Sequence, residues 1–128
     1  MLRWLVAIGV AGVLAALARR YTSLVDVEGQ SMAPALMPGD WLIVESLSFR
    51  RRPPRAGEVV VAPDPWHPDR ELVKRAYPDD AGGYQLLGDA PAASTDSRVF
   101  GSIPAEFVRW RAAFRYWPPS RIGVVRAR

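Results

Sequence analysis

The serine at position 31 lies in a stretch that could present a reactive hydroxyl. It falls within Gly29–Asp40, between a period-2 pattern over Val25–Gly29 and an apolar run over Trp41–Glu45 that follows a Pro-Gly-Asp turn signal. Serines in turns most often satisfy only local hydrogen bonds, so this position alone does not assign chemistry to Ser31. A serine hydroxyl becomes an effective nucleophile only when a neighbouring base takes its proton.

The chain contains a single lysine that could act as such a base. Lys74 is the only lysine among 17 basic residues, and the others are all arginines. Lysine, unlike arginine, can lose its proton at accessible pH when it is buried, because desolvation penalises the ammonium form. Lys74 lies in the predicted strand Glu71–Tyr77, whose alternation directs Arg75 to the opposite face. A Ser-Lys pair is a known substitute for the Ser-His-Asp triad.

Three short motifs follow one another at compatible spacing. They are Ser-Met-x-Pro-x-Leu over 31–36, apolar-apolar-Lys-Arg over 72–75, and Gly-Asp-x6-Asp-Ser-Arg over 88–98. Each motif is weakly specific alone, but in this order they resemble the catalytic-domain motifs of the type I signal peptidase family. The resemblance covers roughly residues 25 to 117.

The resemblance implies a role for each of five residues. Ser31 would be the nucleophile and Lys74 the general base. Ser94 would be a hydroxyl that orients the lysine, and Asp96 with Arg98 would form a structural ion pair beneath the site.

Two residues beside the serine are further candidates. Gly29 would allow close backbone approach, while the Ser31 N–H could donate to a developing oxyanion. In some signal peptidases a hydroxyl residue at that earlier position completes the oxyanion hole; glycine resembles the Gram-positive type and leaves the second donor unassigned. Met32 fits either the wall of an apolar substrate pocket or plain core packing.

The single histidine offers a competing triad. His67 lies between Trp66 and Pro68 in a polar loop, where we expect it to face solvent rather than to act in catalysis. No second histidine and no cysteine accompanies it, so we predict no metal site and no cofactor. The lack of cysteine also excludes disulfides and thiolate nucleophiles.

The elements that must hold these residues are predicted to be mainly β. The 12 prolines and 10 glycines favour short strands and many turns. We predict a small, signal-peptidase-like antiparallel β domain over residues 21–128, preceded by one N-terminal membrane-anchor helix over residues 1–20. The strands are expected at 41–46, 58–62, 71–77, 84–87 and 107–117, with a loop at 50–57.

The N-terminal apolar run predicts a retained, single-pass anchor in the cell membrane. Leu5–Ala18 is unbroken but short, so its length also fits a signal-peptide core or an interfacial helix. No clear Ala-x-Ala cleavage site follows it, and Trp4, Arg3 and Arg19 would extend its reach at the interfaces. The positive charges at the two ends of the run are nearly balanced, with the C-terminal end slightly more positive. They leave open which side of the membrane carries the catalytic domain.

The expected substrate is a precursor protein with an N-terminal signal or leader peptide. Ala35, Ala90 and the stretch 76–78 depart from the family pattern and suggest a divergent branch. Residues 57–75 and 91–101 resemble segments of the proteases that remove the leader of nickel-type superoxide dismutase. A dedicated maturation protease for that enzyme is therefore the alternative function within the same class.

Two alternatives come from other classes. A self-cleaving repressor-like protein shares the Ser-Lys chemistry but needs a DNA-binding module, whereas this N-terminus is apolar. The net charge of +4 and the arginines of 50–55 also fit a non-catalytic basic domain that binds membranes or nucleic acid. The arginine cluster of 50–55 fits either a segment that contacts anionic lipid or a solvated turn. We expect membrane lipid, and not nucleic acid, as a partner of the protein.

Overall fold

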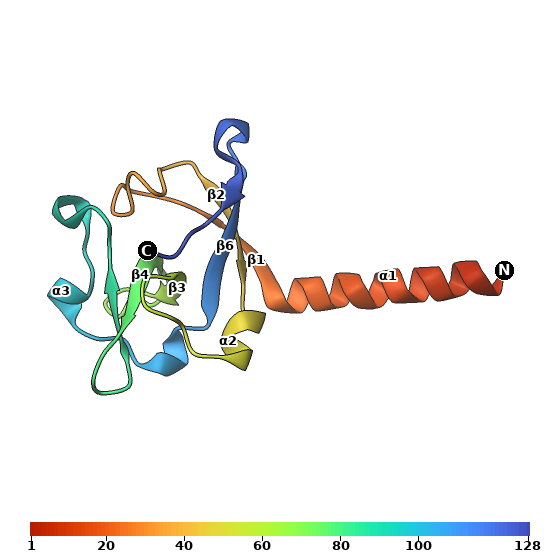
Figure 1. Cartoon of the computed structure of the whole chain (residues 1–128), viewed down its shortest axis with the longest axis horizontal. Coiled ribbons are helices and arrows are strands. Elements are labelled where there is room, and N and C mark those ends of the chain that lie inside the picture. The colour runs from red at the N-terminus through yellow and green to blue at the C-terminus, as the bar shows by residue number, and fades with distance from the viewer.

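A single long helix precedes a compact β unit in the computed structural model, which describes residues 1–128 (Figure 1). The helix α1 (Leu2–Tyr21) projects away from the rest of the chain, and none of its residues is buried. Its 20 residues are long and apolar enough to cross a membrane. Arg19 and Arg20 lie in its last turn, where their charges complement the carbonyl end of the helix.

Seven strands form one antiparallel sheet in the order β1-β2-β6-β3-β4-β5, with β7 paired to β6. This confirms the predicted fold class of a mainly β unit after an apolar helix. The remaining elements are β1 (Thr22–Asp26), β2 (Trp41–Glu45), α2 (Leu47–Arg51), β3 (Val59–Pro63), β4 (Glu71–Pro78), β5 (Tyr84–Leu87), η1 (Pro91–Ala93), α3 (Ser97–Phe100), η2 (Ala105–Phe107), β6 (Trp110–Trp117), η3 (Pro119–Arg121) and β7 (Gly123–Val124).

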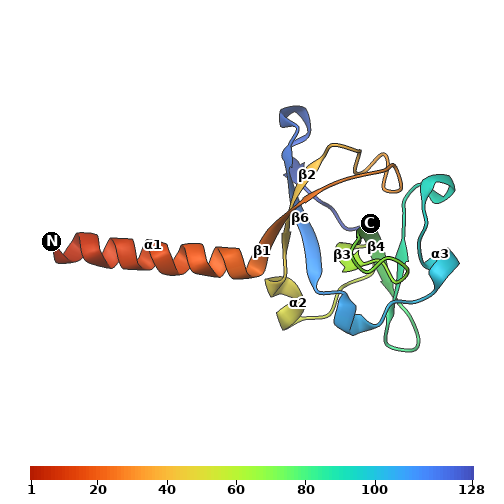
Figure 2. The ribbon, with the colours of Figure 1, turned by 180° about the vertical axis from the view of Figure 1, so that it is seen from behind.

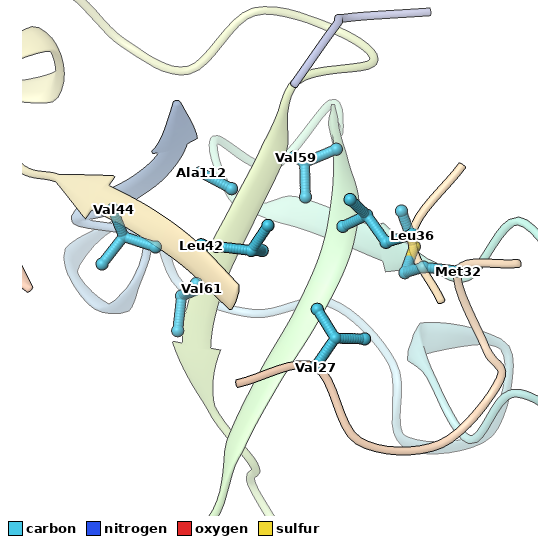
Figure 3. Packing of buried hydrophobic residues seen from close by; sticks show 8 residues of the cluster. All are labelled: Val27, Met32, Leu36, Leu42, Val44, Val59, Val61 and Ala112. Atoms are coloured by element: carbon cyan, nitrogen blue, oxygen red, sulfur yellow. The ribbon is translucent and has the colours of Figure 1, made fainter. Parts of the chain in front are cut away.

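The central strand β3 is covered on both faces. Val59 and Val61 point into one hydrophobic cluster, whereas Val60 and Ala62 point into a second. This division follows from the alternation of side chains along a strand, and it explains why the segment is a continuous apolar run. Figure 3 shows the first cluster, which consists of Val27, Met32, Leu36, Leu42, Val44, Val59, Val61 and Ala112.

Two predicted boundaries differ from the structure by more than one residue. Arg50 and Arg51 belong to the short helix α2 rather than to a loop, because the Ser48 N–H is capped by the Glu45 carboxylate at 2.9 Å. The helix ends at Arg51, and its C-cap residue Arg52 directly precedes a Pro-Pro pair that cannot continue the helix. The last long strand starts at 110 and not at 107, since residues 105–107 form a 3₁₀ turn after a proline.

The hairpin of β4 and β5 carries the third motif back beside Lys74. Asp79 closes the turn by accepting the N–H groups of Ala81 and Gly83 at 2.9 Å each, and Gly82 supplies a positive φ of +89°. The strands pair with Arg75 opposite Leu87, so residue 88 follows next to the lysine strand.

Candidate active site

The turn that carries Ser31 is fixed by the backbone on both sides. The Val27 N–H donates to the Asp40 carbonyl at 2.9 Å, and the Leu36 N–H donates to the Met32 carbonyl at 2.9 Å. Gly29 has a φ of +70°, yet a Cβ added there would meet nothing within 4 Å. The positive φ favours glycine at this position, and the expectation that Gly29 allows close backbone approach at the site stays a prediction.

Both principal candidates line a surface groove of about 810 Å³, but no hydrogen bond joins Ser31 to Lys74. Its walls come from residues 24–32 and from residues 64–74, and both Ser31 and Lys74 line it. Gly29 and Met32 line it as well. Met32 is also almost fully buried in the first hydrophobic cluster, so it contributes to both the groove wall and the core.

Lys74 is buried and makes one side-chain hydrogen bond. Only 4% of the residue is exposed, and its Nζ donates to the Ser94 Oγ at 3.2 Å. The Ser94 hydroxyl in turn donates to the Asp96 Oδ2 at 2.6 Å. Burial lowers the pKa of Lys74; the charge of Asp96 acts against this shift, and that of Arg98 adds to it.

Asp96 anchors this chain of hydrogen bonds from below. It has no exposed surface, and it accepts the Gly88 N–H at 2.8 Å, the Arg98 N–H at 3.1 Å and the Arg98 Nε at 3.0 Å. Burial alone would raise the pKa of Asp96, but the hydrogen bonds from Arg98, Gly88 and Ser94 hold it well below its usual range. The carboxylate therefore stays charged at any pH at which the groove would work.

Gly88 is a site residue that sequence reasoning quoted in a motif but gave no role. A Cβ at this position would lie 2.7 Å from the Ser31 carbonyl oxygen and would collide with the Ser94 Oγ. Two residues on, the Ala90 N–H donates to the same Ser31 carbonyl at 2.8 Å. The Gly88 segment thus holds the serine turn and the lysine partner against each other.

The loop between β3 and β4 forms the far wall of the groove, which the sequence did not predict. The buried Asp64 carboxylate organises this loop by accepting the N–H groups of Trp66 at 2.8 Å and His67 at 3.3 Å. The His67 Nδ1 lies 3.6 Å from Asp64, its side chain is 59% exposed, and it hydrogen-bonds neither Ser31 nor Lys74. No group of three or more metal-ligating side chains is present.

The arrangement of a serine, a buried lysine and a supporting Ser-Asp-Arg chain can be compared with known proteins. Residues 1–77 match the family model described as signal peptidase, peptidase S26. The chain belongs to this family. The matched region contains the apolar helix, Ser31 and Lys74.

Curated members of the family match most of the chain. The mitochondrial ATP-independent inner membrane protease subunit 1a of Arabidopsis thaliana is 34% identical, over 84% of this chain and 78% of its own length. The human mitochondrial inner membrane protease subunit 1 is 32% identical, over 81% and 75% respectively. The signal peptidase I of Leptolyngbya laminosa is 26% identical, over 76% of this chain and 70% of its own length.

The family membership confirms the predicted resemblance and the class of activity. The protein is a membrane protease of the signal peptidase I type, and precursor proteins with leader peptides are the substrates that this family implies. The apolar helix α1 fits the anchoring of such a protease in a membrane.

Proposed function

We propose that this family member cleaves its substrate with Ser31 as the nucleophile and Lys74 as the general base. The observation that carries the proposal is that both residues line one groove, where Lys74 is buried and hydrogen-bonded to Ser94. Burial lowers the pKa of Lys74, which increases the fraction of neutral amine available to accept a proton.

The reaction follows as two acyl transfers. Lys74 Nζ accepts the proton of the Ser31 hydroxyl while Oγ attacks the scissile carbonyl carbon, and the lysine then gives that proton to the leaving amine as the C–N bond breaks. In the second half, Lys74 takes a proton from water, the resulting hydroxide attacks the ester, and the proton returns to the Ser31 Oγ. The products are the leader peptide with a free carboxylate and the mature protein with a free amine.

Three further residues support the lysine in this proposal. Ser94 directs the Nζ by accepting its hydrogen bond, and Asp96 fixes the Ser94 hydroxyl. Arg98 neutralises the buried Asp96 carboxylate, and its charge also favours neutral Lys74. Arg98 is thus assigned a structural and electrostatic role rather than one in bond making.

The Ser31 backbone is suited to stabilise the developing oxyanion. Its N–H donates no hydrogen bond within the chain, whereas the Ser31 carbonyl is held by Ala90. We assign this N–H as the first donor of the oxyanion hole. Gly29 has no hydroxyl that could serve as the second donor to the oxyanion. That donor has to be another side chain or a backbone N–H that lines the groove.

The substrate class is a precursor with an N-terminal signal or leader peptide, cut by a protease of the cell membrane. The relatives named mitochondrial inner membrane protease and signal peptidase I support this class. Within it, a general secretory precursor and the precursor of a nickel-type superoxide dismutase are the two substrates to be distinguished.

A cleavage assay with the full chain in detergent tests both the dyad and the substrate. Ser31→Ala, Lys74→Ala and Lys74→Arg should each reduce the rate to less than about 1% of wild type, because removing one member of such a unit costs most of its catalysis. Two precursors are compared, one with an Ala-x-Ala site and one of nickel dismutase. Activity retained by a folded Lys74→Arg variant would remove the lysine-base mechanism, and the precursor that is cut identifies the role.

A further inference from the structure

The C-terminal end of the anchor helix α1 lies next to the short helix α2. The Ser46 N–H donates to the Tyr21 carbonyl at 2.9 Å, which brings the start of α2 to the end of the anchor. The Arg50 guanidinium lies 5.1 Å from the centre of the Tyr21 ring, and that of Arg20 lies 5.7 Å from it. Figures 1 and 2 show α2 beside the junction of α1 and β1 from two opposite directions.

The orientation of α2 is fixed by contacts on its inner side. Glu45 caps the helix, and Arg52 just beyond it donates to the buried Glu58 carboxylate at 2.7 Å. Phe49 packs against the second hydrophobic cluster. The outer side therefore presents Leu47, which is 42% exposed, and the two exposed arginines of the last turn.

Four arginines at this junction have no acidic partner. Arg19, Arg20, Arg50 and Arg51 form no salt bridge, and we call these four the basic collar. The carboxylates that contact α2 and its C-cap residue are already paired, Glu45 with Arg111 and Glu58 with Arg52. Elsewhere in the β unit, arginines that form salt bridges are Arg75, Arg98, Arg111, Arg115, Arg121 and Arg128. Positive charge is thus left uncompensated where the chain leaves its membrane helix.

We infer that the basic collar is a binding site for the phosphate groups of anionic phospholipids. Guanidinium groups bind phosphate through paired hydrogen bonds, and the collar lies at the C-terminal end of α1, where a membrane-spanning helix would meet the headgroups. The exposed Leu47 beside it would contact the upper part of the acyl chains. Among the arginines of 50–55, the inference assigns Arg50 and Arg51 to the lipid, whereas Arg52 serves the fold.

The collar is tested by lipid binding to the full chain in detergent micelles, measured by native mass spectrometry. The probes are phosphatidylglycerol and phosphatidylcholine, titrated separately. A cationic residue near an anionic surface strengthens binding by roughly fivefold, so the wild type should bind phosphatidylglycerol at least about tenfold more tightly than phosphatidylcholine. This preference should weaken as the salt concentration rises.

Substitutions of the collar arginines test whether the preference for phosphatidylglycerol comes from the basic collar. Arg50→Gln with Arg51→Gln should weaken this preference by about tenfold or more, because two of the four charges are removed, whereas Arg50→Lys with Arg51→Lys should keep most of it. Arg109→Gln with Arg126→Gln removes the same charge from two other exposed arginines without salt bridges, and should leave it unchanged. Unchanged thermal unfolding of the glutamine pair excludes loss of folding as the cause.

Two outcomes would overturn the inference. The first is a wild type without a preference for phosphatidylglycerol, or a glutamine pair that keeps the preference. The second is tight binding of a 20-nucleotide single strand that the glutamine pair loses, combined with equal binding of both lipids. That result would assign the collar to nucleic acid instead. Neither readout depends on cleavage activity, so the result stands apart from the proposed dyad.

Discussion

The ammonium group of Lys74 lies 3.2 Å from the Ser94 hydroxyl and donates a hydrogen bond to it. The hydroxyl cannot give its own proton back to the lysine, because that proton is directed to Asp96 at 2.6 Å. The direction of both hydrogen bonds is therefore set by a buried carboxylate. This gives Ser94 a positioning role that can be separated from a general role in stability.

Replacing Ser94 by alanine should lower kcat about 10- to 100-fold with a small change in KM, because Lys74 loses the contact that fixes its position. Ser97→Ala is the matched control. Ser97 is buried, whereas Ser94 is half-buried, and the Ser97 hydroxyl accepts the Leu86 N–H and does not touch the lysine. We expect Ser97→Ala to cost about 1 kcal/mol of stability with kcat largely retained. Equal losses of kcat in both variants would show that Ser94 acts only through the stability of its segment.

The pH dependence of kcat/KM should report the ionisation of Lys74. The neutral amine is the active form, so activity rises with pH through the pKa of Lys74, which burial places below the ordinary lysine value of about 10.4. Arg98 contributes to this lowering through its charge. Arg98→Gln should therefore shift the rise of kcat/KM on the acid side of the pH profile, the acid limb, to higher pH.

Arg111→Gln is the control for that shift, since Arg111 pairs with Glu45 and is not among the charges that shift the pKa of Lys74. Its acid limb should coincide with that of the wild type. A limb that stays in place in Arg98→Gln, or that moves equally in both variants, would contradict the assignment of the limb to Lys74.

Lys74→Met should raise the free energy of unfolding at pH 7 while abolishing cleavage. Burial disfavours the charged lysine in the folded state, so below the ordinary lysine pKa the unfolded chain binds the proton more readily and wild-type stability is reduced. Between the lowered folded pKa and about 10.4, the stability of the wild type rises with pH. The advantage of Lys74→Met should then shrink as the pH is raised, which urea denaturation at pH 7 and pH 10 measures. A variant less stable than the wild type at both pH values would show that the aliphatic stem and the Ser94 contact outweigh the desolvation of the charge.

Much of the fold could be predicted because the strand signals are strong. The apolar run of β3 and the alternation in β6 define buried and half-buried strands, and the Asp-Asp-Ala-Gly-Gly turn marks the β4–β5 hairpin. The short helix α2 was missed because its existence depends on a cap from Glu45 and a salt bridge from Arg52 to Glu58, and periodicity over five residues cannot reveal either contact.

The groove was less accessible to sequence reasoning than the residues at its centre. Ser31 and Lys74 could be singled out by type and motif, but the loop of residues 64–70 carries no pattern that places it opposite the serine. Its position depends on the Asp64 hydrogen bonds to Trp66 and His67. Gly88 could have been found, since a glycine at the end of a strand often marks close approach of another backbone segment.

Gly88→Ala should impair cleavage by displacing the serine turn from the lysine. The added Cβ would lie 2.7 Å from the Ser31 carbonyl oxygen, and Ser94 blocks its movement in the other direction. The methyl group can be accommodated only if one of these segments shifts. We expect kcat/KM to fall about 100-fold, together with a loss of about 1–3 kcal/mol of stability.

Gly123→Ala provides the comparison, because a Cβ at position 123 meets nothing within 4 Å and this glycine has no positive φ. That variant should retain both activity and stability. The decisive measurement is the activity of Gly88→Ala under conditions where it is fully folded, since low temperature can restore the population of folded protein but cannot restore the alignment of Ser31 with Lys74. Wild-type kcat/KM in the folded Gly88→Ala variant would mean that the Gly88 segment does not set this alignment.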